Sequence, residues 1–230
     1  MLADSAEQPA RRPIRSYVLR QGRLSPAQRR ACDDLFPRYG VPFATGPVDW
    51  PAIFGRVAPV VLEIGFGMGE TTAAIADVHR DIDFIAVDVH LPGVGSLLNR
   101  IEALDLGNVR VIRHDAVEVV HTMIAPSSLA AVHIFFPDPW PKKRHHKRRL
   151  LKPAFVRALA ERLVPHGYLH VATDWNDYAE DALATLGSEA LLANAAAGFT
   201  ERPPWRPLTK FEARGQKLGH HVYDLVFKRV

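Results

Sequence analysis

An apolar strand that runs directly into three prolines constrains this chain more than any other feature. Residues 131–136 read AVHIFF, which predicts a strand buried on both faces, as in the middle of a parallel sheet. Prolines 137, 139 and 141 end the strand, because proline cannot donate a ladder hydrogen bond. We therefore expect Asp138 on a stiff loop at the strand's carboxyl end, the edge at which α/β sheets bind ligands.

A cationic segment follows the prolines. Seven of the eleven residues over 142–152 are Lys or Arg, and such a run repels itself unless an anion neutralises it. A rigid turn and a solvated basic face are the ordinary alternatives. The succession of buried strand, caged carboxylate, aromatic ring and polycation favours the rim of a nucleic-acid active site. The predicted RNA contacts are Lys143, Arg144, Lys147 and Arg148.

A glycine-rich turn gives a second signal. Residues 59–69 read PVVLEIGFGMG, which predicts a buried strand and then a helix from about position 71. Glycines alternate there, as expected where a ligand approaches the backbone closely. A dinucleotide site would instead have the spacing G-x-G-x-x-G, with a pyrophosphate at the helix N-terminus. Glu63 precedes the first glycine, and its charge favours a cationic amino-acid group; a simple tight turn is the alternative.

Acidic residues also follow later expected strands. Strands over 82–87, 109–113 and 168–172 are followed by Asp88, Asp115 and Asp174, respectively. Asp88 can accept both hydroxyls of a ribose, and Asp115 can accept a hydrogen bond from an adenine amino group. Together with Glu63 and Asp138, these strand ends place several carboxylates at one edge of the sheet.

Strands and helices alternate along the chain. Helices are expected over 93–104, 116–124, 155–163 and 178–186, and a last strand over 222–227; residues 190–197 are ambiguous. A short helix is expected to begin at Ser25 and Pro26 and end before Pro37, and residues 36–54 read as an irregular segment. This alternation predicts an α/β three-layer sandwich with a mostly parallel sheet.

Composition limits the class of protein. With 230 residues, 47% of them apolar, the chain can form one sizeable domain, expected over 36–230 after a basic, partly disordered extension over 1–35. The formal charge of +4 is concentrated, which favours a polyanionic partner.

Other residue types exclude further classes. Cys32 is the single cysteine, which excludes an internal disulfide framework. His145 and His146 lack nearby carboxylates or a thiol, so no metal is expected. There is no run of about 18 apolar residues and no signal peptide, so we expect no membrane span and a cytoplasmic location.

Together these motifs resemble the bacterial tRNA (guanine-N7)-methyltransferase family, which depends on S-adenosylmethionine. The resemblance rests on the E-x-G-x-G-x-G turn, FFPDPWPKKRHHKRR, ATDW and TKFEARG, and covers residues 62–227. It implies a Rossmann-like class I methyltransferase fold with a seven-stranded sheet. It also implies methylation of guanine 46 in the tRNA variable loop. The sequence itself requires no partner subunit.

The resemblance also implies roles for individual residues. The implied cofactor contacts are Glu63, Gly65, Gly67, Asp88, Asp115, Ala116 and Asp138, of which Asp138 is also the catalytic position. The implied substrate contacts are Lys142, Asp174, Thr209, Lys210, Phe211 and Glu212. One departure concerns Asp88, where the family usually has the longer Glu. A ribose contact from Asp88 would therefore need a backbone shift or a water.

Three other functions remain open from the sequence. A methyltransferase acting on an exocyclic amine is the nearest, because PDPW stands where such enzymes carry an N/D-P-P-aromatic motif. An NAD-dependent oxidoreductase would share the fold and Asp88, but the glycine spacing disfavours it. A non-catalytic RNA-binding module would explain the basic run but not the converging carboxylates.

Overall fold

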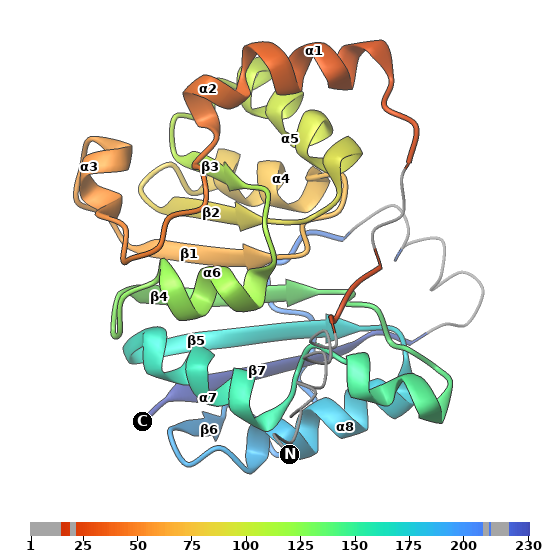
Figure 1. Ribbon diagram of the computed structural model, residues 1–230. Helices are drawn as coiled ribbons and strands as arrows, with labels where there is room; N and C mark the ends of the chain where they lie inside the picture. Colours follow the sequence, from red (N-terminus) through yellow and green to blue (C-terminus); the bar gives the residue numbers. More distant parts are fainter. Residues whose placement is uncertain (1–14, 19–21, 209–211, 213–220) are drawn as a thin grey trace, which may run out of the picture.

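Seven strands of the described chain form one twisted sheet (Figure 1). The computed structural model describes residues 15–18, 22–208, 212 and 221–230. The strands are β1 (Val60–Ile64), β2 (Asp83–Val87), β3 (Val109–Ile112), β4 (Leu129–Phe135), β5 (Leu163–Thr173), β6 (Leu192–Asn194) and β7 (Tyr223–Arg229). Their order in the sheet is β3-β2-β1-β4-β5-β7-β6.

The sheet is mostly parallel, as predicted. Strands β1 to β5 pair in parallel, and β7 runs antiparallel to both β5 and β6. Strand order reverses between β1 and β4, because the chain goes outward to β2 and β3 and then returns to the other side of β1. In open α/β sheets, ligands bind outside the carboxyl ends of the strands at such a switch point.

Helices cover both faces of the sheet (Figure 1). One face carries α1 (Pro26–Asp34), α2 (Phe36–Tyr39), α4 (Glu70–Val78) and α5 (Leu91–Ala103). The other carries α3 (Trp50–Phe54), α6 (Ala116–Thr122), α7 (Pro153–Arg162) and α8 (Asn176–Gly187). A short 3-10 helix, η1 (Lys143–Arg148), follows β4. The three-layer sandwich is therefore confirmed.

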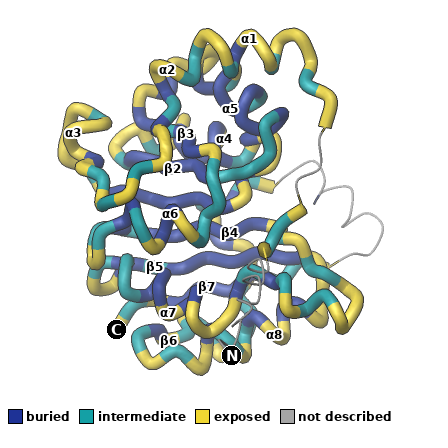
Figure 2. The backbone as a smooth tube through the Cα atoms, in the orientation of Figure 1, coloured by how far each residue is buried: buried dark blue, intermediate teal, exposed yellow. Residues whose placement is uncertain are grey.

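Two hydrophobic cores hold the layers together, one on each face of the sheet. Successive strand residues point to opposite faces, so Val61 packs in the core beneath α4 and α5 while Leu62 packs beneath α6 and α7. Every residue of β1 and β2 is buried, which explains their near-continuous apolar sequences (Figure 2). Full burial of each large aliphatic side chain contributes roughly 1.5 to 3 kcal/mol.

The expected N-terminal helix is present as α1 and packs against α5. Ser25 and Gln28 form a capping box at its start. A Cβ atom on Gly95 of α5 would lie 2.5 Å from the carbonyl oxygen of Gln28, so glycine permits the close approach of the two helices. The expected disorder of the first dozen residues lies outside the described residues.

One expectation needs correction, and one ambiguity is resolved. Residues 36–54 are not simply irregular, since they contain the short helices α2 and α3, each with proline in its first turn. The ambiguous segment over 190–197 contains the short edge strand β6. In the part of the chain that the structure describes, no helix is long and apolar enough to cross a membrane.

Candidate active site

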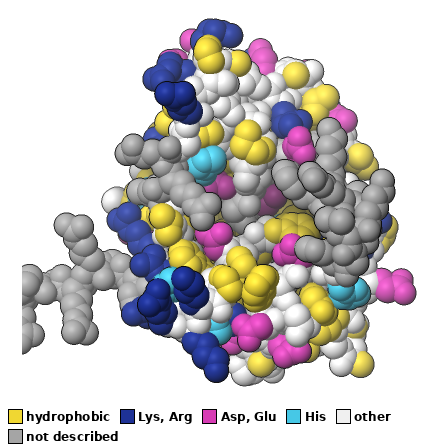
Figure 3. Space-filling model, turned by 90° about the vertical axis from the view of Figure 1, so that its right-hand side faces the viewer, with side chains coloured by type: hydrophobic (Ala, Val, Ile, Leu, Met, Phe, Trp, Pro, Cys, Tyr) yellow, Lys and Arg dark blue, Asp and Glu magenta, His cyan; other side chains and the backbone are white. Residues whose placement is uncertain are grey.

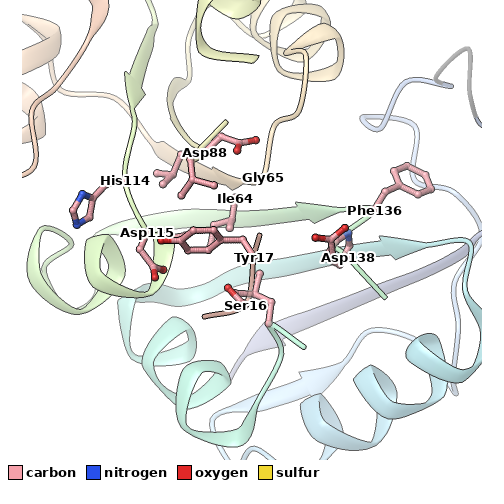
Figure 4. A pocket seen from close by; sticks show the side chains of 14 residues that line it. Ser16, Tyr17, Ile64, Gly65, Asp88, His114, Asp115, Phe136 and Asp138 are labelled. Atoms are coloured by element: carbon pink, nitrogen blue, oxygen red, sulfur yellow. The ribbon is translucent and has the colours of Figure 1, made fainter. Parts of the chain in front are cut away.

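A pocket of about 230 Å³ opens at the carboxyl ends of the parallel strands (Figure 4). Predicted site residues that line it are Gly65, Asp88, Asp115, Ala116 and Asp138. Figure 3 views the molecule onto this edge of the sheet, where Lys and Arg side chains gather on one side. Residues from four separate loops therefore meet where the strand order predicts a ligand site.

The glycine turn between β1 and α4 has left-handed backbone at alternate positions. Gly65 and Gly67 have φ values of 78° and 57°, which side chains rarely tolerate. A Cβ atom added at either would meet nothing within 4 Å, so both glycines border open space. Gly69 differs, because its added Cβ would lie 2.7 Å from Leu97 Cβ. The first two glycines therefore leave room for a ligand, and the third allows helix packing.

Asp88 follows β2 and fixes the glycine turn. Its Oδ2 accepts a hydrogen bond from the Gly67 backbone N–H at 3.0 Å, and its Oδ1 accepts one from the His90 N–H at 2.9 Å. Burial raises the pKa of the Asp88 carboxyl, while these backbone donors oppose the shift. Both carboxylate oxygens of Asp88 are thus hydrogen-bonded to the backbone, and these bonds fix the side chain at the pocket wall.

Glu63 lies deeper than predicted. It sits within β1, is only 2% exposed and is not among the residues that line the pocket. Burial, and secondarily the charge of Asp88, raises the pKa of Glu63 to about 7. Its Oε2 has no hydrogen-bond partner among the described residues. A buried, unsatisfied carboxylate oxygen costs free energy unless a cationic or donor group approaches it.

Asp115 follows β3 and begins α6. Its Oδ1 accepts a hydrogen bond from the Val117 N–H at 3.0 Å, so it is the N-cap of that helix. The adjacent Ala116 lines the pocket, and the neighbouring His114 stacks on Phe43 at 3.9 Å between ring centroids. Capping therefore holds one edge of the Asp115 carboxylate while the residue faces the pocket.

The loop after β4 presents Asp138 to solvent and to the pocket. Phe136 and Trp140 have φ values of 52° and 49°, left-handed conformations that are uncommon for bulky residues. These residues flank Asp138, which is exposed between two conformationally restricted positions. Local strain of this kind is typical of functional loops.

A segment of the N-terminal extension also borders the pocket, which sequence reasoning missed. Ser16 and Tyr17 are among its lining residues, and Figure 4 shows the Tyr17 ring beside Asp115. Trp140 Nε1 donates a hydrogen bond to the Ser16 carbonyl oxygen at 3.2 Å. Burial and the nearby charge of Asp115 raise the pKa of the Tyr17 hydroxyl. The sequence held no periodic signal for this contact.

The predicted RNA contacts lie on η1, directly after the Asp138 loop. Lys143, Arg144 and Lys147 are exposed, as is the predicted substrate contact Lys142. Arg148 is half-buried, and its guanidinium lies 5.1 Å from the centroid of the Trp140 ring. The exposed members thus form a cationic rim beside the pocket, while Arg148 supports Trp140 (Figure 3).

The remaining predicted substrate contacts fall on two other segments. Asp174 is exposed directly after β5. Thr209, Lys210 and Phe211 lie outside the described residues. Glu212 is buried, and both of its carboxylate oxygens accept hydrogen bonds from Arg206, at 2.6 and 2.9 Å.

Arg206 anchors a buried polar network that the sequence did not reveal. It is fully buried, pairs with Asp224 of β7 as well as with Glu212, and lies 5.7 Å from the centroid of the Phe136 ring. His170 completes the network: its Nε2 is 2.7 Å from Asp224, and its Nδ1 accepts a hydrogen bond from the Trp205 indole. The network connects Glu212 to Asp224 and His170 of the sheet.

These features fit S-adenosylmethionine. The unsatisfied Glu63 oxygen suits the ligand's ammonium group, and the open space at Gly65 and Gly67 can admit its amino-acid portion. Asp88 and Asp115 suit the hydroxyl and amino groups of its nucleoside portion. The seven-stranded sheet with its antiparallel β7, together with this switch-point site and its acidic lining, is the arrangement expected of a class I S-adenosylmethionine-dependent methyltransferase.

Comparisons with known proteins agree. Residues 57–225 match the family model described as "Putative methyltransferase". A tRNA (guanine-N(7)-)-methyltransferase of Thiobacillus denitrificans is 58% identical and aligned over 100% of both chains, and one of Nitrosospira multiformis is 58% identical over 95% of both. The chain therefore belongs to the tRNA (guanine-N7)-methyltransferase family.

Solved structures support the fold alone. The 16S rRNA methyltransferase KamB aligns with a TM-score of 0.58 and 16% identity, over 78% of this chain and 92% of that one. TrmN from Thermus thermophilus aligns with a TM-score of 0.54 and 17% identity, over 75% of this chain and 44% of that one. Both alignments show that the chain shares the Rossmann-like fold of these proteins.

Proposed function

We propose that this protein methylates N7 of the guanine at position 46, in the variable loop of tRNA, with S-adenosylmethionine as the methyl donor. The observation that carries this proposal is the placement of Asp138, which borders the pocket and directly precedes a rim of exposed cations on η1. Relatives that share 58% identity over nearly the whole chain are named tRNA (guanine-N(7)-)-methyltransferase, which supports the base and the atom; position 46 comes from the sequence resemblance. A tRNA substrate implies a cytoplasmic location.

The proposed cofactor contacts are those that the sequence indicated, including Ala116 and Asp138, which line the pocket. Asp88 and Asp115 would bind the nucleoside part, and Glu63 would bind the amino-acid part from beneath the glycine turn. Gly65 and Gly67 would allow the ligand to lie against the backbone. When bound, S-adenosylmethionine supplies a methyl group on a positively charged sulfur.

Asp138 is the proposed catalytic residue, acting through charge and hydrogen bonding. Guanine N7 has an in-plane lone pair and no proton, so the nucleophile needs no base. Catalysis then depends on positioning and on electrostatic stabilisation of the charge that moves to guanine. An exposed carboxylate at the pocket edge can accept hydrogen bonds from the guanine N–H edge and balance the cationic product.

The proposed substrate contacts surround Asp138. Lys142 would bind a backbone phosphate, and Asp174 would orient the nucleotide from the end of β5. Thr209, Lys210 and Phe211 are the other proposed contacts with the nucleotide. The Glu212 carboxylate is buried against Arg206, so the proposed contact from Glu212 would come from its backbone. Lys143, Arg144 and Lys147 would bind phosphates further along the tRNA.

Nucleoside analysis tests the proposal. Unmodified tRNA is incubated with the protein and S-adenosylmethionine, digested and separated. The expected product is 7-methylguanosine, and a tRNA with adenine at position 46 should accept no methyl group. Methyl transfer to an exocyclic amine would instead establish the rival methyltransferase activity. Binding of tRNA without any transfer would support a non-catalytic RNA-binding module.

A further inference from the structure

One arginine of the cationic segment is buried. Arg149 directly follows η1, yet its side chain is only 3% exposed, whereas Lys143, Arg144 and Lys147 are exposed. A buried guanidinium is costly unless its donors are satisfied, and it cannot contact a phosphate at the surface. Arg149 therefore differs in function from the cations that precede it.

Arg149 makes directional contacts with two other segments. Its Nε donates a hydrogen bond to the Pro139 carbonyl oxygen at 3.1 Å, and its Nη1 donates one to Asp181 Oδ2 at 3.0 Å. Its Nη2 donates to Asp177, and its guanidinium lies 5.0 Å from the centroid of the Tyr178 ring. The planar fork thus joins the proline-rich loop to the first two turns of α8.

These contacts join segments that carry proposed site residues. Pro139 directly follows Asp138, the proposed catalytic carboxylate. Asp177 lies in the first turn of α8, three positions after the proposed substrate contact Asp174. The Arg149 backbone N–H donates a hydrogen bond to the His146 carbonyl oxygen at 3.0 Å. This bond links the cationic helix η1 to the residue that joins the other two segments.

We propose that Arg149 is a positioning residue that fixes the position of the Asp138 loop relative to Asp174, at the end of β5, and to the exposed cations of η1. This inference rests on the proposed function of those segments. Strand β4 ends at Phe135, and the Phe136 N–H still donates a hydrogen bond to the Ala172 carbonyl oxygen of β5 at 2.7 Å. The Pro139 carbonyl contact adds a restraint three residues further on, next to Asp138. Lysine cannot replace the fork, because an ammonium group cannot satisfy the Pro139, Asp177 and Asp181 acceptors with the same planar geometry.

Substitutions at Arg149 test the inference against a matched control. Arg149→Met and Arg149→Lys are compared with Arg157→Met. Arg157 also bonds two carboxylates, Glu161 and Glu189, but lies exposed on α7. The measurements are the single-turnover methyl-transfer rate at saturating tRNA, the affinities for tRNA and S-adenosylmethionine, and the salt dependence of tRNA binding.

A positioning role predicts a specific pattern. The saturated rate should fall by about 10- to 100-fold in Arg149→Met, the scale expected for a displaced reacting group, with cofactor affinity within about twofold. Arg149→Lys should recover only part of the rate, and Arg157→Met should keep the wild-type rate. A wild-type saturated rate in Arg149→Met would overturn the inference. If tRNA then bound more weakly and with a smaller salt slope, Arg149 would be an RNA contact. If only thermal stability fell, its role would be purely structural.

A second variant keeps the inference testable if Arg149→Met does not fold. Asp181→Asn removes the charge from one partner and should lower the saturated rate by about threefold. Combined with Arg149→Lys, it should cause little additional loss, since both changes weaken one contact. Full additivity would overturn the inference. These rates are measured on whichever base the wild type methylates, so failure to form 7-methylguanosine contradicts only the proposed function.

Discussion

The pKa of Glu63 leads to a quantitative prediction for cofactor binding. Burial, and secondarily the charge of Asp88, raises this pKa to about 7, so much of the free protein carries a proton on Glu63 near neutral pH. The ammonium group of S-adenosylmethionine is expected beside the unsatisfied Glu63 oxygen, where it favours the ionised carboxylate. Binding should therefore release the proton.

The size of the effect follows from the two protonation states. If the bound pKa returns to an ordinary value near 4.5, the affinity at pH 6 should be about tenfold weaker than at pH 8. About 0.9 proton should be released per ligand at pH 6. The folded protein alone should lose roughly 3 kcal/mol of stability as pH rises from about 4.5 to 7, because its Glu63 holds a proton that the unfolded chain has released.

Calorimetry in buffers of different ionisation enthalpy measures both affinity and proton release. Glu63→Gln keeps the shape of the protonated acid and should bind more weakly than wild type at pH 8, with no Glu63-dependent change in affinity between pH 6 and 8. The ligand's own amine titrates in both proteins, so the ratio of their affinities isolates Glu63. An unchanged ratio across this range would refute the proposed contact.

Two other predictions concern charged residues outside the pocket. Changing Lys143, Arg144 and Lys147 to Ala should weaken tRNA binding and reduce the log-log salt slope by about 0.7 to 0.9 for each phosphate that is no longer neutralised; an unchanged slope in filter binding would assign these side chains to solvent. Arg206→Met should reduce the free energy of unfolding in urea by about 3 to 5 kcal/mol, because it leaves the buried Asp224 without its cation. Arg206→Met with Asp224→Asn should recover part of this stability, and a single-variant decrease below about 1 kcal/mol would contradict the predicted role of Arg206.

The parts of the fold that sequence predicted are those determined by local pattern. The apolar runs in β1, β2 and β4 identify buried strands, and the parallel arrangement places the acidic residues that follow β2, β3 and β4 at one edge. Asp88 and Asp115 could therefore be assigned to one site before any coordinates, since each follows an expected strand.

Other features depend on contacts between distant residues. In the sequence, Arg149 looks like one more exposed cation, because its ion pairs with Asp177 and Asp181 of α8 form only in the folded chain. Tyr17 lies in a segment without periodicity and is held near the pocket by the contact between Ser16 and Trp140. No local pattern encodes these pairings. The short helices α2 and α3 were missed because each is no longer than five residues and contains proline.

Single-turnover methyl transfer by Asp138→Asn tests the central claim most directly. The substitution keeps the volume and one acceptor but removes the charge. With tRNA and S-adenosylmethionine saturating, the rate should fall by about 10²- to 10³-fold, the usual cost of removing one aimed electrostatic contact. Folding should survive, because Asp138 is exposed, and the residual rate should gain no new pH dependence. A wild-type rate would contradict the catalytic role of Asp138, as would a pH profile whose acid limb disappears with the carboxylate.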